Sequence, residues 1–357
     1  MDRRPLGPSL SAHGVRHGLA RAQAIAARSH IPRRLKIAAI AVAIAFIGIG
    51  VWRVTHESQP ALPLIVGVDD DTLKWTPFPL TIVRRQQSLG ARAVRVWVPW
   101  HGEIAPTAVR RDELARAETA ARTTKVVLAV FGFGAQTPTA AWAQTRFCGY
   151  ARAALALVPD ARAVVVWNEA NSRTYWRGSP AQYESLLARC YDELHSTRVQ
   201  VLDSTASAHA PIAFLDAMAA AYRASGRTRP LVDAFGHNPY PLTPTEPPTA
   251  VHRGDFIGEG DYTRLVAALR AFGRSPSIWY LEDGFQTTKI SPAQQARDLT
   301  TAIGMAACQP LVRAYFNFEL VDETRTAGWH SGLIWRGGKL KPAAAAFASA
   351  PRRCHTS

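Results

Sequence analysis

The chain has 357 residues, of which 47% are hydrophobic, so it can bury a large core and is neither a disordered nor a low-complexity protein. Its formal net charge is +15, but residues 1–36 hold eight Arg and Lys against one Asp, so roughly half of the excess lies on an N-terminal arm. This uneven distribution argues against a nucleic-acid-binding protein and leaves a nucleic-acid role for the arm as the weaker alternative to a topological one.

The first predicted element is an uncharged apolar run over residues 37–52, flanked by Lys36 and Arg53. The run is near the lower length limit for a bilayer-spanning helix, and the flanking basic side chains extend it by reaching the interface. We expect a single transmembrane signal-anchor helix over residues 37–53. The basic residues before it predict a cytoplasmic arm at 1–36 and an extracytoplasmic remainder. The alternative is a cleaved secretory signal and a secreted protein, although the basic region is long for one and no A-x-A-like site follows.

After a linker at residues 54–63, apolar runs alternate with helical segments. Strands are expected at 64–68, 93–98, 125–131, 163–167, 199–203, 231–235, 277–281 and 312–318. Helices are expected at 81–89, 112–123, 140–157, 179–197, 211–224, 262–272, 292–307 and 341–348. This order and size predict an α/β protein with a (β/α)8 TIM barrel over residues 64–350 and a tail at 351–357. A doubly wound open sheet is the main alternative, because it shows the same alternation.

The four cysteines show no metal-site spacing, and the strands are not followed by nucleotide-binding, serine-hydrolase or zinc-protease motifs. We therefore expect no metal and no cofactor. Outside the cytoplasm two disulfides are possible, and we favour the local pairing Cys148–Cys190 with Cys308–Cys354. Free buried cysteines are the alternative.

Polar and aromatic side chains follow the predicted strands, at the end of a barrel that carries function. The candidate site residues are Asp70, Arg95, Trp100, Asn168, Glu169, Trp176, His237, Tyr240, Glu282 and Trp329. Glu169 follows the fourth strand and Glu282 the seventh, so they would face each other across the barrel end. A single Glu at a strand end is more often part of an ion pair, but cleavage of a glycosidic bond requires such a carboxyl pair.

Residues 167–171, WNEAN, resemble the W-N-E-P-N acid/base motif of clan A glycoside hydrolases. Residues 237–241, HNPYP, resemble the sixth-strand H-x-Y-P region with one residue shifted, and 282–284, EDG, resemble the nucleophile segment T-E-x-G. Residues 328–333 and 341–343 resemble the last loop and closing helix of bacterial members, including β-xylosidase-like and cellulase-like proteins. The resemblance covers about residues 64–348.

This resemblance implies that Glu169 is the general acid/base and Glu282 the nucleophile of a retaining double displacement. It also implies binding roles: Asn168 at the substrate 2-OH, Arg95 and Tyr240 beside Glu282, and His237 on the same wall. Three tryptophans are candidate sugar-stacking platforms, with packing of the barrel rim as the alternative: Trp100, Trp176 and Trp329. Asp70 belongs to an acidic run that favours a sugar-binding or solvated turn over a metal site.

Three residues depart from the family pattern: Ala170 replaces Pro, Leu281 replaces Thr, and Asp283 adds a carboxylate beside Glu282. We expect Asp283 to face away from the sugar, because neighbouring residues on a strand point to opposite sides. The predicted function is a membrane-anchored extracytoplasmic retaining glycosidase acting on an oligo- or polysaccharide. The alternatives are a non-catalytic carbohydrate-binding or envelope protein on the same barrel, and a transglycosylase.

Overall fold

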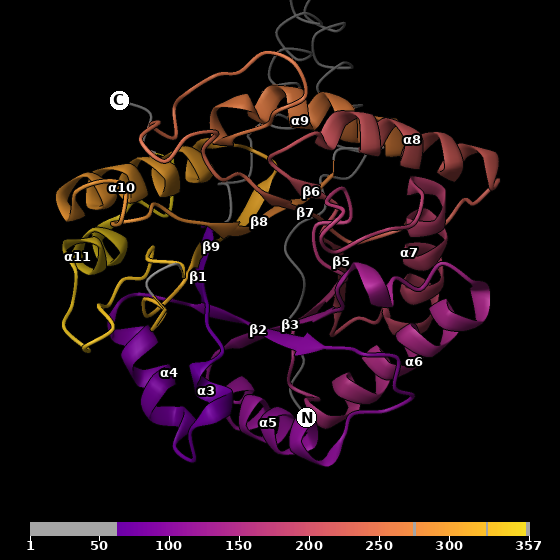
Figure 1. Ribbon diagram of the computed structural model, residues 1–357, viewed down its shortest axis with the longest axis horizontal. Coiled ribbons are helices and arrows are strands. Elements are labelled where there is room, and N and C mark those ends of the chain that lie inside the picture. The colour runs from indigo at the N-terminus through magenta and orange to yellow at the C-terminus, as the bar shows by residue number, and fades with distance from the viewer. Residues whose placement is uncertain (1–62, 274–275, 326–327, 355–357) are drawn as a thin grey trace, which may run out of the picture. The chain divides into compact units, whose positions relative to one another are not determined.

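The computed structural model describes residues 63–273, 276–325 and 328–354. Nine strand segments in these ranges form one parallel sheet in the order β5-β4-β3-β2-β1-β9-β8-β7-β6, with helices in a ring around it (Figure 1). The strands are β1 (Ile65–Asp69), β2 (Ala93–Pro99), β3 (Lys125–Phe131), β4 (Ala163–Val166), β5 (Gln200–Asp203), β6 (Ala206–Ser207), β7 (Phe235–Asn238), β8 (Ile278–Asp283) and β9 (Val312–Phe318). The α-helices are α3 (Thr72–Trp75), α4 (Pro79–Ser88), α5 (Ala108–Ala121), α6 (Ala141–Leu157), α7 (Pro180–Leu194), α8 (Pro211–Ala224), α9 (Tyr262–Leu269), α10 (Pro292–Cys308) and α11 (Pro342–Ser349). Short 3-10 turns are η1 (Gly134–Gln136), η2 (Glu259–Asp261) and η3 (Arg270–Phe272).

The sheet closes between β5 and β7. Leu202 and Ala234 form a parallel bridge there, and Asp233 N donates to Val201 O at 2.7 Å. The buried carboxylate of Asp203 accepts from Gly236 N at 2.6 Å, and a Cβ on Gly236 would lie 2.2 Å from Asp203 O, so this close seam requires glycine. Since β5 and β6 are two pieces of one strand position, eight parallel strands form a nearly closed (β/α)8 barrel, and the predicted fold class is confirmed.

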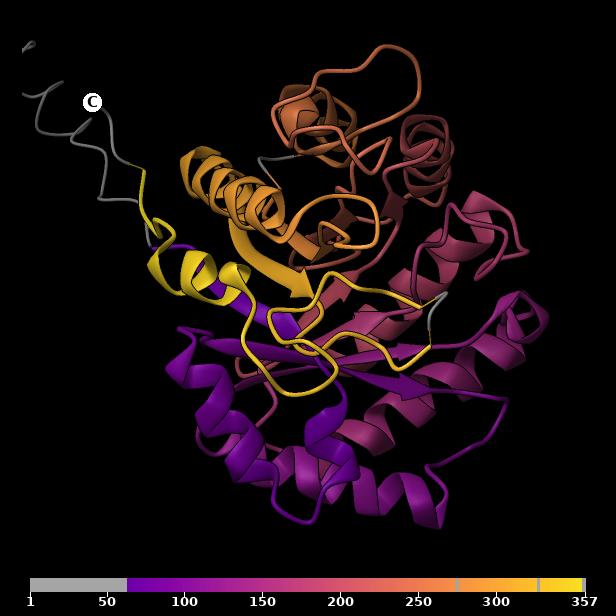
Figure 2. The same ribbon diagram turned by 60° about the vertical axis from the view of Figure 1, so that its left-hand side comes forward.

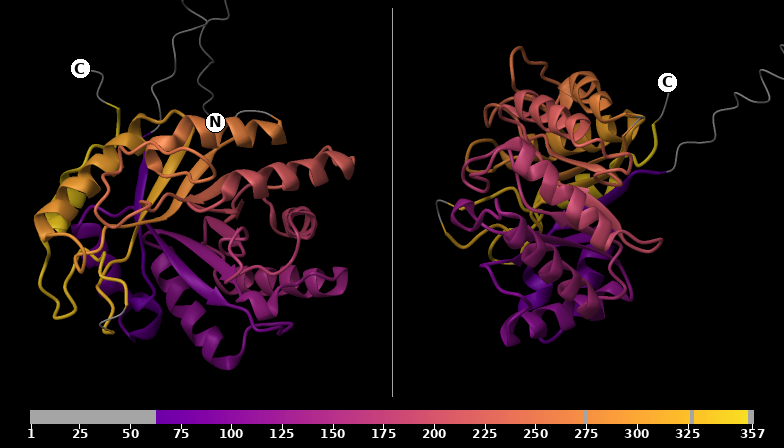
Figure 3. Two further views of the ribbon diagram at one scale, coloured as in Figure 1. Left: turned by 45° about the horizontal axis from the view of Figure 1, so that its top comes forward. Right: turned by 90° about the vertical axis from the view of Figure 1, so that its right-hand side faces the viewer.

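Two apolar layers hold the barrel together. The inner layer fills the barrel with side chains such as Val127, Leu202 and Phe316. The outer layer joins alternate residues of the same strands, such as Val96 and Val164, to the buried faces of the helices. Helices therefore lie outside the strands in every view (Figures 2 and 3). Side chains alternate between these layers along each strand because successive residues point to opposite faces of a sheet.

Two predicted elements begin four residues away from their expected starts. The sixth strand was expected at 231–235 but is β7, Phe235–Asn238, because the Asp233 side chain occupies Val201 N, at 2.7 Å, and so displaces the ladder. The second helix was expected from Asp112 but starts at Ala108, because the Thr107 side chain caps it by accepting from Arg110 N at 3.3 Å. By contrast, Ser179 caps α7 with Pro180 in its first turn, as predicted.

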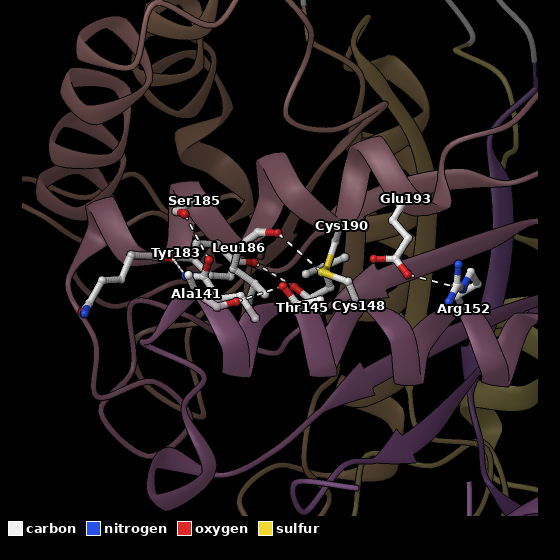
Figure 4. Close-up of a disulfide and its surroundings, with 12 residues drawn as sticks. Ala141, Thr145, Cys148, Arg152, Tyr183, Ser185, Leu186, Cys190 and Glu193 are labelled. Carbon is white, nitrogen blue, oxygen red and sulfur yellow. Dashed lines mark hydrogen bonds and ion pairs between the residues drawn. A yellow bond between two sulfur atoms is a disulfide. The ribbon is translucent and has the colours of Figure 1, made fainter. Parts of the chain in front are cut away.

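Both predicted disulfides are confirmed. Cys148–Cys190 joins neighbouring helices α6 and α7, beside the ion pair of Arg152 and Glu193 at 3.3 Å (Figure 4). Cys308–Cys354 joins the end of α10 to the C-terminal segment that follows α11. Crosslinks across sequence separations of 42 and 46 residues restrict the unfolded chain and stabilise the fold by about 4 kcal/mol each.

Within residues 63–273, 276–325 and 328–354, no helix is long and apolar enough to cross a bilayer. The predicted anchor at 37–53 lies outside these residues, as do the arm at 1–36 and most of the linker at 54–63. The membrane anchor therefore stays a prediction.

Candidate active site

The fourth strand delivers Asn168 and Glu169 through a turn with left-handed backbone angles. Trp167 has φ 70° and Glu169 has φ 38°, which are strained values for residues with side chains. Trp167 thus joins Val166 in the outer layer, and Asn168 and Glu169 turn toward the mouth, the barrel end formed by the carboxyl ends of the strands. Ala170 N donates to Ser204 O at 3.0 Å, a hydrogen bond that the usual Pro cannot make.

The eighth segment, β8, delivers Glu282 through a bulge. Tyr280 pairs with Tyr315 and Asp283 with Asn317, so β8 holds one residue more than β9 over this stretch. Leu281 consequently packs in the inner layer and Glu282 also faces the barrel interior, where it meets Arg95. Bulges often re-aim a side chain beside a functional site in this way.

Asp283 faces the outer layer, as expected. Tyr315 donates to its Oδ2 at 2.7 Å and Gly284 N to its Oδ1 at 2.8 Å. Burial raises the pKa of Asp283 to about 7. The second carboxyl group of this segment is therefore separated from the mouth by the strand itself.

Arg95 on β2 is fully buried and connects the two glutamate-bearing strand ends. Its Nη1 donates to Glu282 Oε1 at 2.8 Å and to Asp69, and its Nη2 donates to Asn168 Oδ1 at 3.2 Å. The guanidinium also lies 4.2 Å from the ring centroid of Trp97, whose Nε1 donates to Asp69 Oδ1 at 2.6 Å. Burial acts to lower the pKa of Arg95, but the charges and hydrogen bonds of Asp69 and Glu282 outweigh it and raise the pKa above its ordinary value.

Glu282 has a further donor in Tyr240. The Tyr240 hydroxyl donates to Glu282 Oε2 at 3.3 Å, and burial, with the charge of Glu282, raises the pKa of Tyr240 well above its ordinary value. The Tyr240 ring lies 5.1 Å from that of Trp329, which is partly exposed. Glu282 therefore accepts from a cation on one oxygen and from a phenol on the other.

Glu169 has a different environment. Its Oε1 accepts from the amide Nδ2 of Asn238 at 3.0 Å, and its backbone N donates to Ser204 Oγ at 3.2 Å. Burial and the charge of Glu282 raise the pKa of Glu169 to about 7, while Asn238 and Arg95 act in the lowering direction. Near neutral pH, a carboxyl group with this pKa is protonated in a substantial fraction of the protein molecules and can donate its proton.

Four predicted site residues lie elsewhere. His237 Nε2 donates to Ile257 O at 2.9 Å and its ring packs on Tyr280 in the outer layer, because β7 turns Asn238 rather than His237 toward Glu169. Trp100 and Trp176, 3% and 2% exposed, pack around Trp167 and Phe147 instead of offering a face to a sugar. Asp70, in the turn after β1, accepts from Thr72 and from Gln86 of α4.

The structure adds residues that the sequence interpretation missed. Asn238 and Asp69 reach the mouth, whereas their neighbours His237 and Asp70 were chosen. Strand alternation carried the signal: Asp69 is in register with Arg95, and residues in register on adjacent strands share a face. Tyr175 lies on the same loop as Glu169, and burial together with the charges of Glu282 and Glu169 raises the pKa of Tyr175 to about 12.

No model of a known protein family matches the sequence, and no curated protein is similar to it in sequence. Solved structures are similar in fold. A family 39 glycoside hydrolase from Bacteroides cellulosilyticus WH2 matches with TM-score 0.62 and 17% identity. The match covers 81% of this chain but only 64% of that protein. A GH5_18 protein from Bifidobacterium longum subsp. infantis matches with TM-score 0.59 and 19% identity, over 81% of this chain and 78% of that one.

A variant of GH5_18 from Streptomyces cattleya, in complex with Manb1-4GlcNAc, matches with TM-score 0.58 and 19% identity, over 82% of this chain and 80% of that one. Such identities establish a shared fold and leave the activity open. The resemblance seen in the sequence therefore holds at the level of architecture, and the chain has the eight-stranded barrel fold of clan A glycoside hydrolases.

Proposed function

We propose that the protein is a retaining glycosidase that hydrolyses O-glycosidic bonds of an oligo- or polysaccharide, with Glu282 as nucleophile and Glu169 as general acid/base. The observation that carries the proposal is the unequal environment of the two glutamates. Glu282 is held by the Arg95 cation and the Tyr240 hydroxyl, whereas Glu169 faces one neutral amide and has a pKa raised to about 7. Two carboxyl groups whose environments differ in this way suit one ionised and one protonated role.

In the first step, Glu282 attacks the anomeric carbon while Glu169 gives its proton to the departing oxygen, so a glycosyl ester forms and the leaving group departs neutral. Loss of the negative charge on Glu282 lowers the pKa of Glu169, since that charge is one cause of its elevation. Glu169 is then ionised and takes a proton from the water that attacks the ester. The second step restores both carboxyl groups to their starting state.

The contacts of Arg95 and Asn168 support a role in orientation. Asn168 Oδ1 is occupied by Arg95 Nη2 at 3.2 Å and Ser204 Oγ at 3.3 Å, which fixes the amide so that its Nδ2 can donate to the sugar 2-OH. A donor held in place before the reaction loses little entropy when charge develops on the substrate. Trp329 beside Tyr240 remains the candidate platform for the sugar that is attacked.

The GH5_18 complexes contain Manb1-4GlcNAc, and on this likeness in fold we propose a β-linked pyranoside as substrate. The apolar run at 37–52 and the basic arm before it support a helix that holds the barrel outside the cytoplasmic membrane. The substrate would then be a glycan of the cell envelope or its surroundings. The alternative of a carbohydrate-binding protein without activity was suggested by Leu281 and by Asp283 beside Glu282, and the outward orientation of Asp283 removes one of these two motives.

The test is a screen of the protein on aryl β-glycosides of glucose, mannose, xylose and N-acetylglucosamine and on envelope polysaccharides. Replacing Glu282 with Ala should lower turnover by on the order of 10⁵-fold, and azide should restore part of it as a β-glycosyl azide. Product analysis separates hydrolysis from transfer to a second sugar. Turnover of any substrate at the wild-type rate by Glu282→Ala would refute the assignment.

A further inference from the structure

An exposed pair of aromatic rings lies on the loops that follow β3 and β4. Phe133 comes two residues after β3 and is 47% exposed. Its ring stacks on that of Tyr175 with centroids 5.7 Å apart and planes inclined by 21°. Aromatic rings that pack the barrel rim are buried, as Trp100 and Trp176 are, with 3% and 2% exposed. Phe133 is far more exposed than these rings, so packing of the rim does not account for it.

The backbone of the two loops fixes this pair. Gly134 N donates to Thr174 O at 2.9 Å, and Trp167 Nε1 donates to Tyr175 O at 2.9 Å. A Cβ on Gly134 would lie 2.9 Å from Arg173 O, so only glycine lets the loops approach this closely. Phe133 N donates to Gln136 Oε1 at 2.8 Å, which anchors the residue to the turn η1.

Aromatic contacts connect the pair to the mouth. Phe131 lies 6.3 Å from Tyr175 and 5.6 Å from Phe133, and it packs edge-on against Trp97 at 4.6 Å. Trp97 in turn donates to Asp69 and lies against Arg95. The rings therefore form a continuous wall from the contacts of Glu282 to solvent, and Tyr175 lies in the same loop as Glu169.

We propose that Phe133 and Tyr175 form a stacking subsite for a pyranose unit on the leaving-group side of the cleaved bond. The proposal rests on the proposed function, because Glu169 gives its proton to the leaving oxygen and Tyr175 follows Glu169 along the same loop. A ring with one exposed face takes the C–H face of a pyranose, which is apolar while its rim of hydroxyls stays in water. The site therefore selects glycans with at least one pyranose unit after the cleaved bond.

The experiment compares Phe133→Leu with Phe133→Trp, since the first keeps an apolar side chain without a ring and the second keeps a ring. Each is assayed on cellotetraose, mannotetraose and laminaritetraose, and on the 2,4-dinitrophenyl β-glycoside of the same sugar, whose leaving group is no sugar. Phe133→Leu should lower kcat/KM on the tetrasaccharide about tenfold and leave the aryl glycoside unchanged. Phe133→Trp should retain activity on both substrates, because it keeps an aromatic ring at this position.

Equal losses of Phe133→Leu on both substrates, or no loss on either, would overturn the subsite. Failure of the proposed function is a separate result, in which wild-type protein hydrolyses none of these substrates. Calorimetric titration of the same tetrasaccharides into Glu169→Gln and into Glu169→Gln with Phe133→Leu then decides the subsite. Binding weakened about tenfold by the second change supports it, and equal or undetectable binding in both refutes it.

Discussion

The ends of β4 and β8 both break the alternation of side chains along a strand, but they do so with different backbone conformations. A regular strand sends successive side chains to opposite faces, so it cannot turn two neighbouring residues toward the mouth. After β4, left-handed angles at Trp167 and Glu169 break the alternation, and in β8 one extra residue does so. The turn after β4 brings Asn168 and Glu169 in together, whereas the bulge brings Glu282 in and leaves Asp283 outside.

The two devices are also held by different interactions. The turn after β4 depends on the Trp167 ring, which packs against Trp100, Phe147 and Trp176 in the outer layer. The bulge depends on a hydrogen bond between the buried Asp283 carboxyl and Tyr315. Strained backbone persists only where the surrounding structure holds it. In this protein an apolar cluster holds the strained turn after β4, and a directional hydrogen bond holds the bulge in β8.

We expect the largest effect from replacing Arg95, because this residue contacts both the end of β4 and the end of β8. Arg95→Met leaves Asp69 and Glu282 as buried carboxylates without their cation, and it removes one of the two donors to Asn168 Oδ1. We expect the free energy of unfolding to decrease by about 3–5 kcal/mol and turnover to be lost. Urea unfolding followed by circular dichroism measures the first. Wild-type stability of Arg95→Met would show that the two ends are independent.

Glu169→Gln tests the end of β4 alone. Because an amide cannot protonate the leaving group, kcat should fall by about 10²–10⁴-fold on substrates with sugar leaving groups. A 2,4-dinitrophenolate leaves without a proton, so formation of the glycosyl ester from that substrate should be nearly unchanged in burst kinetics. Equal losses in this step on both substrates would assign Glu169 another role.

Tyr315→Phe tests the anchor of the bulge in β8. Loss of the hydrogen bond to Asp283 should let Glu282 move and lower kcat about tenfold, with KM less affected. Tyr280→Phe is the matched control, since it also removes a buried tyrosine hydroxyl from the outer layer, in this case one that donates to Gln309 at 2.5 Å. If both variants lose the same activity, general destabilisation rather than the bulge is responsible.

The smallest effect is on proton affinity. Glu169 must be protonated for the first step, and its pKa of about 7 predicts that kcat/KM falls as pH rises through about 7. Glu282→Gln removes a negative charge, so the pKa of Glu169 should decrease but stay above its ordinary value, because burial is the larger cause. Carbon-13 NMR titration of glutamate carboxyl groups measures this shift; an unchanged pKa would show that the two groups do not interact.

The sequence predicted the barrel and its order of elements well, because both rest on local patterns. Apolar runs located strands such as β3 and β9 at their observed bounds, and capping residues located α7. The errors have local physical causes: the Thr107 cap starts α5 early, and the Asp233 side chain delays β7. His237 was chosen because residues 237–241 resemble the H-x-Y-P region, whereas the structure turns Asn238 toward Glu169.

Within the candidate site, the motif WNEAN and the pairing of Glu169 with Glu282 came from the sequence alone. The sequence also favoured the observed disulfide pairing, because the two cysteines of each pair are close along the chain. Only the tertiary structure decided which side chains reach the mouth. A bulge and a left-handed turn change the facing of a residue without changing the composition of the strand, and the stacking of Phe133 on Tyr175 depends on how closely two loops approach.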